Sequence, residues 1–382
     1  MKSHKVRFAF RVGAVYIFHF QIKGTDMDSE SLQAIVAPLL EWYDRHARIL
    51  PWRESPEPYR VWISEIMLQQ TRVEAVKPYY DRFLKELPDL HALAEASEPQ
   101  LLKLWEGLGY YNRVRNLQKA ARVIVSEYGG EFPRDVETLR SLPGIGEYTA
   151  GAIASISFNR PEPAVDGNVL RVVSRLAASR EDISSPKVKG AISDALRQVY
   201  PAGRCGDFTQ SLMELGATVC LPNGAPRCAE CPLAELCAGR REGIAAGLPV
   251  KPGRKPRRIE PRTVFLLRCG DRIALLRRPG NGLLAGLWEF PNTAGSLTVA
   301  EAAEWMAGQG IFAERIIATG GAKHVFTHLE WHMSGFLADC KAENGGFHWV
   351  TRDELEREIS LPTAFRPFVE ALDAESAQPS LF

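Results

Sequence analysis

The spacing of apolar residues changes once along this chain of 382 residues, and the change requires two structurally different parts. Over residues 28–239, apolar side chains recur every three or four positions, as at Leu32, Ile35 and Leu39, which is the period of an amphipathic helix. After Arg262 the apolar residues gather in short runs that are typical of strands. We therefore expect a multi-domain chain in which an all-α domain precedes a smaller α+β domain.

The same two periods predict the individual elements, and clusters of Pro and Gly separate them. Helices are expected over 60–71, 74–87, 99–105, 114–128, 147–157, 168–178, 187–199 and 209–219 of the first domain. The second domain is expected to contain strands over 263–267, 272–276, 325–327 and 331–336 and helices over 298–309 and 351–359.

Two basic segments interrupt a chain whose net charge is only +1. Residues 240–262 carry a net charge of +6 and read as an exposed linker, because they are rich in Arg, Lys, Pro and Gly. Residues 1–27 carry +4 and are interpreted as an upstream start or a disordered extension, with a targeting segment as the alternative. The expected divisions are an extension at 1–27, a helical domain at 28–239, a linker at 240–261, a second domain at 262–370 and a tail at 371–382.

The composition, 45% hydrophobic and 24% charged, is that of a globular protein. The near balance of charge excludes a uniformly basic coat for nucleic acid, but it allows a local basic stripe. Since uninterrupted apolar runs of about 18 residues are lacking, no membrane partner is expected.

Cysteines crowd into one short segment, 220–237, with the spacing C-x7-C-x2-C-x5-C. This distribution is unlike a secreted disulfide framework and indicates a metal or cluster site in a reducing compartment. Zinc ribbons favour two C-x2-C pairs, and this segment has one, so the wider gaps favour a 4Fe–4S cluster, with zinc as the alternative.

A second motif, Leu142 to Ala150, places Gly144 and Gly146 between two helical patterns. Backbone N–H groups at such a turn can bind a phosphate without reading sequence, although a plain helix–helix turn is the alternative. Asp166 follows, in the sequence Asp-Gly-Asn that ends at Asn168. This aspartate is either a helix cap or a catalytic carboxylate.

In chain order, the hairpin, the aspartate and the cysteines resemble the helix-hairpin-helix DNA glycosylases of the endonuclease III superfamily. Further segments narrow the resemblance to the adenine DNA glycosylases of MutY type, over about residues 28–370: 50–53, 59–71, 107–113, 208–216, 286–291 and 324–328. The resemblance implies a helical glycosylase domain with an iron–sulfur loop, followed by a Nudix-like domain. It also implies that the enzyme excises adenine mispaired with 8-oxoguanine or guanine, after flipping the adenine out of the duplex.

Three residues match the family's catalytic positions. Glu65 matches the general acid that protonates the leaving adenine, and an apolar helix suits that role because burial raises the pKa of a carboxyl group. A solvated helix charge is the alternative for Glu65. Asp166 matches the carboxylate that stabilises the cationic sugar. Tyr148 stands where bifunctional relatives carry a Lys, so the resemblance implies a monofunctional glycosylase, with an endonuclease III-type glycosylase/lyase as the alternative.

The remaining site residues follow from the resemblance alone. The pocket for the extruded adenine is expected to include Arg48, Trp52, Arg53 and Gln210. DNA contacts are expected from Leu68, Gln70, Tyr110, Gly144, Gly146, Asn168, Phe326, Thr327 and His328. The 4Fe–4S ligands are expected to be Cys220, Cys228, Cys231 and Cys237.

Two departures from the family pattern concern Thr327, where the family's turn carries Ser, and the first cysteine gap, which has seven residues where the family has six. The carboxylates of the Nudix motif are missing after Gly286, so nucleotide hydrolysis is not expected. A silent mismatch-binding protein is a further alternative, but Glu65 and Asp166 are both present. The expected partner is double-stranded DNA with an A:8-oxoguanine or A:G mispair, bound by a monomer in the cytoplasm, at the nucleoid, of a bacterium.

Overall fold

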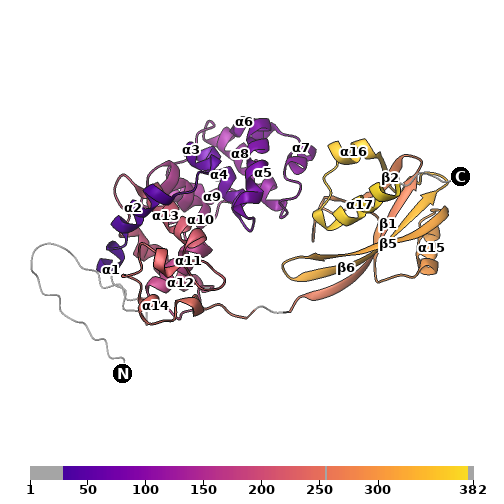
Figure 1. The fold of residues 1–382 in the computed structure, drawn as a ribbon. Coiled ribbons are helices and arrows are strands. Elements are labelled where there is room, and N and C mark those ends of the chain that lie inside the picture. Colours follow the sequence, from indigo (N-terminus) through magenta and orange to yellow (C-terminus); the bar gives the residue numbers. More distant parts are fainter. Residues whose placement is uncertain (1–28, 254–255, 377–382) are drawn as a thin grey trace, which may run out of the picture. The chain divides into compact units, whose positions relative to one another are not determined.

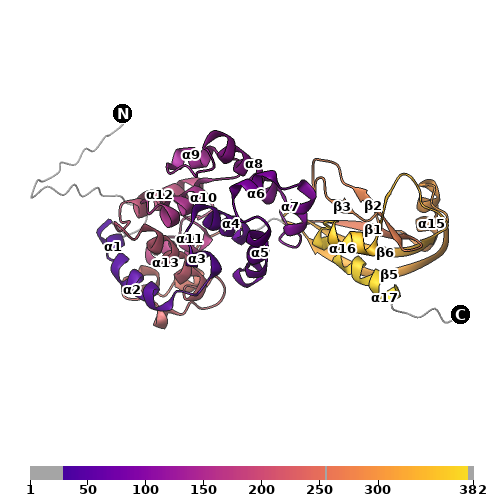
Figure 2. The ribbon, with the colours of Figure 1, turned by 90° about the horizontal axis from the view of Figure 1, so that it is seen from above.

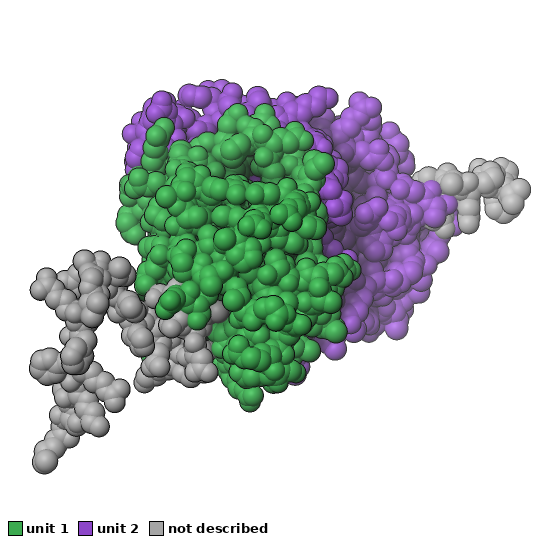
Figure 3. Space-filling model, turned by 60° about the vertical axis from the view of Figure 1, so that its left-hand side comes forward, with its two compact units in different colours: residues 1–62, 133–141, 145–252 green, residues 63–132, 142–144, 253–382 purple. Residues whose placement is uncertain are grey.

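A computed structural model describes residues 29–253 and 256–376 (Figure 1). The extension expected at 1–27 therefore lies outside the described residues, as do the last six residues of the tail, 377–382. The chain forms two compact units (Figure 3). Unit 1 comprises residues 1–62, 133–141 and 145–252, and unit 2 comprises residues 63–132, 142–144 and 253–382.

Helices build the chain up to residue 247. They are α1 (Ser29–Gln33), α2 (Val36–His46), α3 (Pro51–Glu54), α4 (Pro58–Leu68), α5 (Val73–Glu86), α6 (Leu90–Glu95), α7 (Glu98–Leu104), α8 (Asn112–Glu127), α9 (Val136–Ser141), α10 (Glu147–Ala152), η1 (Ile153–Ser157), α11 (Gly167–Leu176), α12 (Pro186–Arg197), α13 (Cys205–Thr218), η2 (Cys228–Glu230), α14 (Ala238–Arg241) and η3 (Ala245–Gly247).

Strands dominate the part of unit 2 that follows residue 253. The elements are β1 (Arg258–Cys269), β2 (Arg272–Arg277), β3 (Trp288–Glu289), β4 (Asn292–Ala294), α15 (Val299–Gly308), β5 (Ala313–Val325), β6 (Leu329–Cys340), β7 (His348–Thr351), α16 (Arg352–Arg357), η4 (Thr363–Phe365) and α17 (Arg366–Ser376).

The core of unit 1 lies where the apolar stripes of α2, α11, α12 and α13 meet. Leu39 of α2, Val172 of α11 and Leu212 of α13 are all at most 2% exposed. Apolar residues at helical spacing therefore face one another, which is what the sequence pattern predicts. This packing fixes α11, which Asp166 caps, and α13, which carries Gln210 and Glu214.

The helical part of unit 2 consists of the end of α4 and helices α5 to α8. Trp105 and Phe83 meet edge to face, with ring centroids 6.0 Å apart. The buried Gln118 of α8 donates from Nε2 to the carbonyl oxygen of Ala96, at 2.6 Å, which satisfies the backbone at the end of α6.

The sheet of unit 2 is mixed, with the strand order β3-β2-β1-β6-β5. Strands β1 and β6 run parallel, whereas β2 and β5 pair antiparallel to their neighbours. Both faces are covered (Figure 2): Trp305 of α15 stacks on Phe265, with centroids 4.0 Å apart, and Phe368 of α17 is buried in the core that contains Leu337 and Val264. The predicted fold class, an all-α domain followed by an α+β domain, is thus confirmed.

Several elements differ from the sequence prediction. The helix expected over 147–157 is α10 followed by a π-helical turn, η1. Residues 326–328, of which two were expected in a strand, form the turn between β5 and β6. The segment expected as a linker contains η3 and the start of β1, and α17 continues to Ser376, with Leu372 only 3% exposed. In residues 29–253 and 256–376 no helix has the length and apolarity needed to cross a membrane.

Candidate functional site

Glu65 lies in the last turns of α4 and is only 6% exposed. Its neighbours Ile66 and Met67 are buried, and so is Trp62 one turn earlier. The alternative of a solvated helix charge is therefore excluded for Glu65. Among charged residues such burial is unusual and marks the position as a candidate for chemistry.

Arg113 fixes the end of the same helix. Its Nη1 donates to the carbonyl oxygens of Ile66 at 2.6 Å and Gln69 at 2.7 Å, and its Nη2 donates to that of Leu108 at 2.9 Å. Burial lowers the pKa of Arg113 to about 10, so it remains a cation at neutral pH. The hydrogen bonds of the Arg113 guanidinium thus connect the end of α4 with the loop before α8.

Gln70 and Tyr110, which are both expected to contact DNA, have left-handed backbone conformations. Gln70, directly after α4, has φ 61°, and Tyr110, in the loop before α8, has φ 48°. Both are exposed, whereas Leu68 is half-buried. A non-glycine residue in this region is strained, and such strain is found preferentially at functional positions.

Asp166 caps α11 and is half-buried. Its Oδ1 accepts hydrogen bonds from the backbone N–H groups of Asn168 and Val169, both at 2.8 Å, and its Oδ2 accepts one from Asn168 Nδ2 at 2.7 Å. Burial raises the pKa of this carboxyl group, although these hydrogen bonds and the charge of Arg171 oppose the shift. The structure therefore bears out the cap, and the cap orients Asp166 rigidly.

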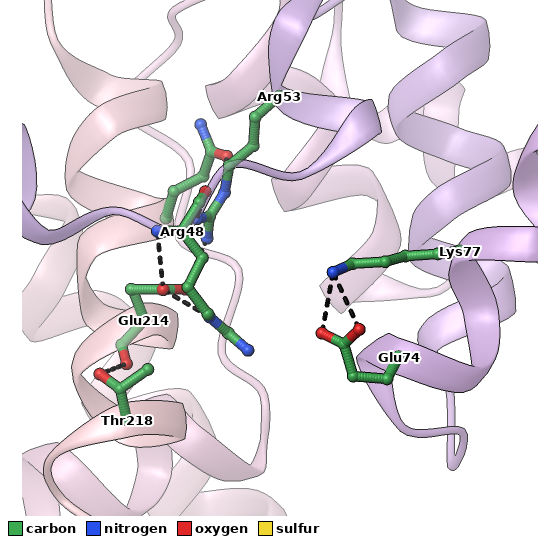
Figure 4. Close-up of polar contacts among 7 residues, drawn as sticks. Arg48, Arg53, Glu74, Lys77, Glu214 and Thr218 are labelled. Atoms are coloured by element: carbon green, nitrogen blue, oxygen red, sulfur yellow. Dashed lines mark hydrogen bonds and ion pairs between the residues drawn. The ribbon is translucent and has the colours of Figure 1, made fainter.

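Two of the residues expected to form the adenine pocket, Arg48 and Arg53, bind a carboxylate that we did not predict, Glu214 of α13 (Figure 4). Arg48 donates to it from Nε at 2.6 Å, from Nη2 at 2.9 Å and from its backbone N–H at 3.1 Å. Arg53 donates from Nη2 to Glu214 at 2.8 Å and from Nε to Gln210 Oε1 at 3.1 Å. Trp52, beside Arg53 in α3, is buried.

The Glu214 side chain is fully buried. Burial alone would raise its pKa, but the hydrogen bonds and charges of Arg48 and Arg53 outweigh burial and lower it below its usual value. Glu214 lies four residues after Gln210, so both project from one face of α13. That spacing, and its place in the family-like segment 208–216, were the signals in the sequence that could have identified Glu214.

The hairpin motif forms a turn between α9 and α10. Gly144 has φ +76°, and a Cβ atom there would lie 2.7 Å from Asn116 Cβ, so the position requires glycine. Gly146 has φ −89° and directly precedes α10. Both glycines are exposed. Tyr148, in the first turn of α10, is half-buried.

The four clustered cysteines line one cavity in unit 1, together with mostly apolar side chains of α11 and α13. All four are free thiols. Burial raises the pKa of Cys231 to about 11, and the charges of the other three cysteines add to the shift. Over residues 29–253 and 256–376, no three Cys, His, Asp or Glu side chains form a group that could hold a single metal ion.

The segment Phe326–His328 lies in the turn between β5 and β6. The N–H of Phe326 donates to the carbonyl oxygen of Leu329 at 2.8 Å and closes the turn, which leaves Thr327 and His328 exposed. Tyr110 Oη lies 3.0 Å from Thr327 Oγ1, at hydrogen-bond distance. Both residues border a cavity of about 610 Å³. Unit 2 thus brings together two residues that are 217 positions apart in the chain.

Comparison with known proteins identifies both parts of the chain. Residues 63–198 match the model of the HhH-GPD superfamily of base excision DNA repair proteins, and residues 263–371 match that of the NUDIX domain. A solved structure of a thermostable thymine-DNA glycosylase is similar, with a TM-score of 0.50 and 28% identity. The similarity covers 56% of this chain and 98% of that one.

Curated relatives extend over most of the chain. The adenine DNA glycosylases of Mus musculus and Homo sapiens are each 36% identical to it over 86% of its length, which covers 76% of the mouse protein and 72% of the human one. That of Buchnera aphidicola subsp. Baizongia pistaciae is 32% identical over 78% of this chain and 83% of its own length. The chain therefore belongs to the adenine DNA glycosylases, a family of base excision DNA repair enzymes.

Proposed function

We propose that this chain hydrolyses the N-glycosidic bond of adenine mispaired with 8-oxoguanine or guanine in double-stranded DNA, as a monomer, and leaves an intact strand with an abasic site. The observation that carries the proposal is the burial of Glu65, which is 6% exposed on α4. An apolar environment is one in which a carboxyl group can keep its proton and act as a general acid at neutral pH.

We assign opposite tasks to the two carboxyl groups; burial raises the pKa of Asp166, so its ionised form depends on the hydrogen bonds it accepts and on the charge of Arg171. Glu65 donates a proton to N7 of the flipped adenine, so that the base leaves as a neutral molecule. Asp166 remains ionised and stabilises the positive charge that develops on the sugar. The backbone N–H groups of Asn168 and Val169, each 2.8 Å from its Oδ1, support the ionised form.

Tyr148 supports a hydrolytic reaction that stops at the abasic site. A bifunctional enzyme needs an amine that attacks the sugar and cleaves the strand through an imine. A phenol cannot form that imine. We therefore assign Tyr148 to positioning the sugar or Glu65.

The Glu214 network supports recognition of the base. Arg48 and Arg53 neutralise the Glu214 carboxylate, and Arg53 also holds Gln210 through its Oε1 at 3.1 Å. With Oε1 occupied, the Gln210 amide nitrogen can donate to a ring nitrogen of adenine. Trp52 supplies an apolar wall beside these groups.

The turn at Thr327 supports reading of the base opposite adenine. Thr327 is exposed, and its hydroxyl lies 3.0 Å from that of Tyr110 beside the 610 Å³ cavity. The hydroxyl can hydrogen-bond the N7–H that distinguishes 8-oxoguanine from guanine. Tyr110 and Gln70, both exposed, fill the gap in the duplex.

The cysteine segment fits a 4Fe–4S cluster, which Cys220, Cys228, Cys231 and Cys237 would hold. All four line one cavity, as expected for the ligands of a single cluster. The cluster when bound supplies structural stability. It would fix the loop that carries Arg227, whose side chain is 57% exposed and can meet a phosphate.

Substitution of Glu65 by Gln tests the assignment of the general acid. Glu65→Gln keeps the size of the side chain, so binding to a duplex with an A:8-oxoguanine mispair should persist while adenine release is lost. Glu57→Gln is the matched control, because Glu57 is 66% exposed just before the same helix and should leave release unchanged. Normal turnover by Glu65→Gln would overturn the assignment.

A further inference from the structure

One buried cation, Arg175, lies apart from the residues assigned to adenine, and no part of the mechanism uses it. Arg175, near the end of α11, is 2% exposed. Its Nε donates to the carbonyl oxygen of Leu248 at 2.9 Å, and its Nη1 donates to that of Leu221 at 2.9 Å. The same Nη1 lies 3.1 Å from Cys220 Sγ. The Arg175 carbonyl oxygen in turn lies 3.4 Å from Cys237 Sγ.

Among the residues that the structure describes, no carboxylate pairs with Arg175. Within the described part of the chain, its hydrogen-bond acceptors are two carbonyl oxygens and the Cys220 sulfur. Its buried Nη2 has no hydrogen-bond partner there. An unpaired buried cation is unfavourable, so this position requires an anionic group nearby.

The cysteine cavity can supply that anion. Arg175 lines the same cavity as Cys220, Cys228, Cys231 and Cys237. Cysteines that bind a metal do so as thiolates, and four of them around a 4Fe–4S cluster carry a net negative charge. A bound cluster would therefore place a negative charge beside Arg175.

We propose that Arg175 is a positioning residue for the 4Fe–4S cluster: its guanidinium bonds the sulfur of Cys220, holds the loop ligands in place and raises the reduction potential of the cluster. The proposal rests on the cluster assigned under the proposed function. The direction follows from charge, because a fixed cation and an N–H···S bond stabilise the reduced form, which carries one more negative charge, more than the oxidised form.

Arg240 offers a matched control. It lines the same cavity, but its side chain is 41% exposed. Its Nη1 donates to Glu235 Oε1 at 2.6 Å. Solvent and the carboxylate both screen its charge. Arg240→Gln should therefore leave the reduction potential close to that of the unsubstituted protein.

The test uses the full chain, purified without oxygen, as the unsubstituted protein and as Arg175→Met, Arg175→Lys and Arg240→Gln. Iron and sulfide content of the unsubstituted protein decides first whether a cluster is present, independently of Arg175. The potential is then measured by a redox titration followed by electron paramagnetic resonance. We expect a negative shift for Arg175→Met, a smaller one for Arg175→Lys and none for Arg240→Gln.

If Arg175 only holds the loop in place and does not act on the cluster, its replacement would leave the reduction potential unchanged. Clusters of equal potential in Arg175→Met and the unsubstituted protein would therefore overturn the proposal. If Arg175→Met does not fold, Arg175→Lys decides in the same way, because lysine keeps the charge but cannot reproduce the three bonds of the guanidinium. An unshifted potential in Arg175→Lys would then refute the role of Arg175.

Discussion

Replacing Glu214 by Gln removes the charge that Arg48 and Arg53 share, with little change in shape. The Glu214 side chain is fully buried, while Arg53 is 14% and Arg48 is 35% exposed. Loss of one partner from a buried ion pair costs about 3–5 kcal/mol, and the partial exposure of Arg48 favours the lower end. A loss of about 3 kcal/mol lowers the melting temperature of a domain of this size by about 6–12 °C.

The same substitution has a predicted dependence on pH. The pKa of Glu214 in the folded chain lies below its usual value of 4.5, so the ionised group stabilises the fold above that pH. This contribution is lost as the pH falls through the folded pKa, where the carboxylate takes up a proton. The difference in stability between the unsubstituted protein and Glu214→Gln should therefore shrink below about pH 4.5.

Thermal unfolding at about pH 7 and about pH 3.5 measures both effects. Glu74→Gln is the control, because Glu74 pairs with Lys77 at 2.8 Å on the surface of α5 and is 76% exposed (Figure 4). An exposed pair of this kind contributes nothing measurable in many proteins. The reasoning fails if Glu214→Gln has the same melting temperature as the unsubstituted protein at neutral pH. It also fails if the substitution lowers the melting temperature equally at both pH values.

Two further predictions concern contacts with DNA. Gly144→Ala should weaken DNA binding and cost about 1–3 kcal/mol of stability, because φ is +76° and Asn116 leaves no space for a Cβ atom. Gly146→Ala, with open space at its Cβ position, should cost less in binding titrations and melting curves, and equal losses would refute the steric argument. Thr327→Val should slow adenine release opposite 8-oxoguanine by about 2- to 10-fold, the worth of one hydrogen bond, and leave release opposite guanine unchanged in single-turnover assays. Equal slowing opposite both bases would contradict the role of the hydroxyl.

The helical part of the chain was predictable because its helices are amphipathic. The periods around Leu39, Val172 and Leu212 predict α2, α11 and α13 to within a few residues, and the core of unit 1 is made of those stripes. Strand β5 (Ala313–Val325) was missed. All of its residues are exposed or half-buried, and it contains Gly320 and Gly321, so it shows no alternation of apolar and polar residues.

Contacts in the candidate site were predictable only where the interacting residues lie close together in the sequence. The Asp166 cap is local, since its donors lie two and three residues away. Glu214 could not be found in the same way, because its partners Arg48 and Arg53 lie 166 and 161 positions away and only the tertiary fold brings them together. The pairing of Tyr110 with Thr327 likewise depends on the folding of unit 2.

Release of adenine in single turnover, from duplexes that differ only in the base opposite adenine, tests the proposed function most directly. The account predicts release opposite 8-oxoguanine and opposite guanine, none opposite thymine, and a strand that stays intact until alkali is added. Release opposite thymine at a similar rate would contradict the assignment of the substrate. Strand scission without alkali, with an enzyme–DNA adduct trapped by borohydride, would contradict the hydrolytic mechanism.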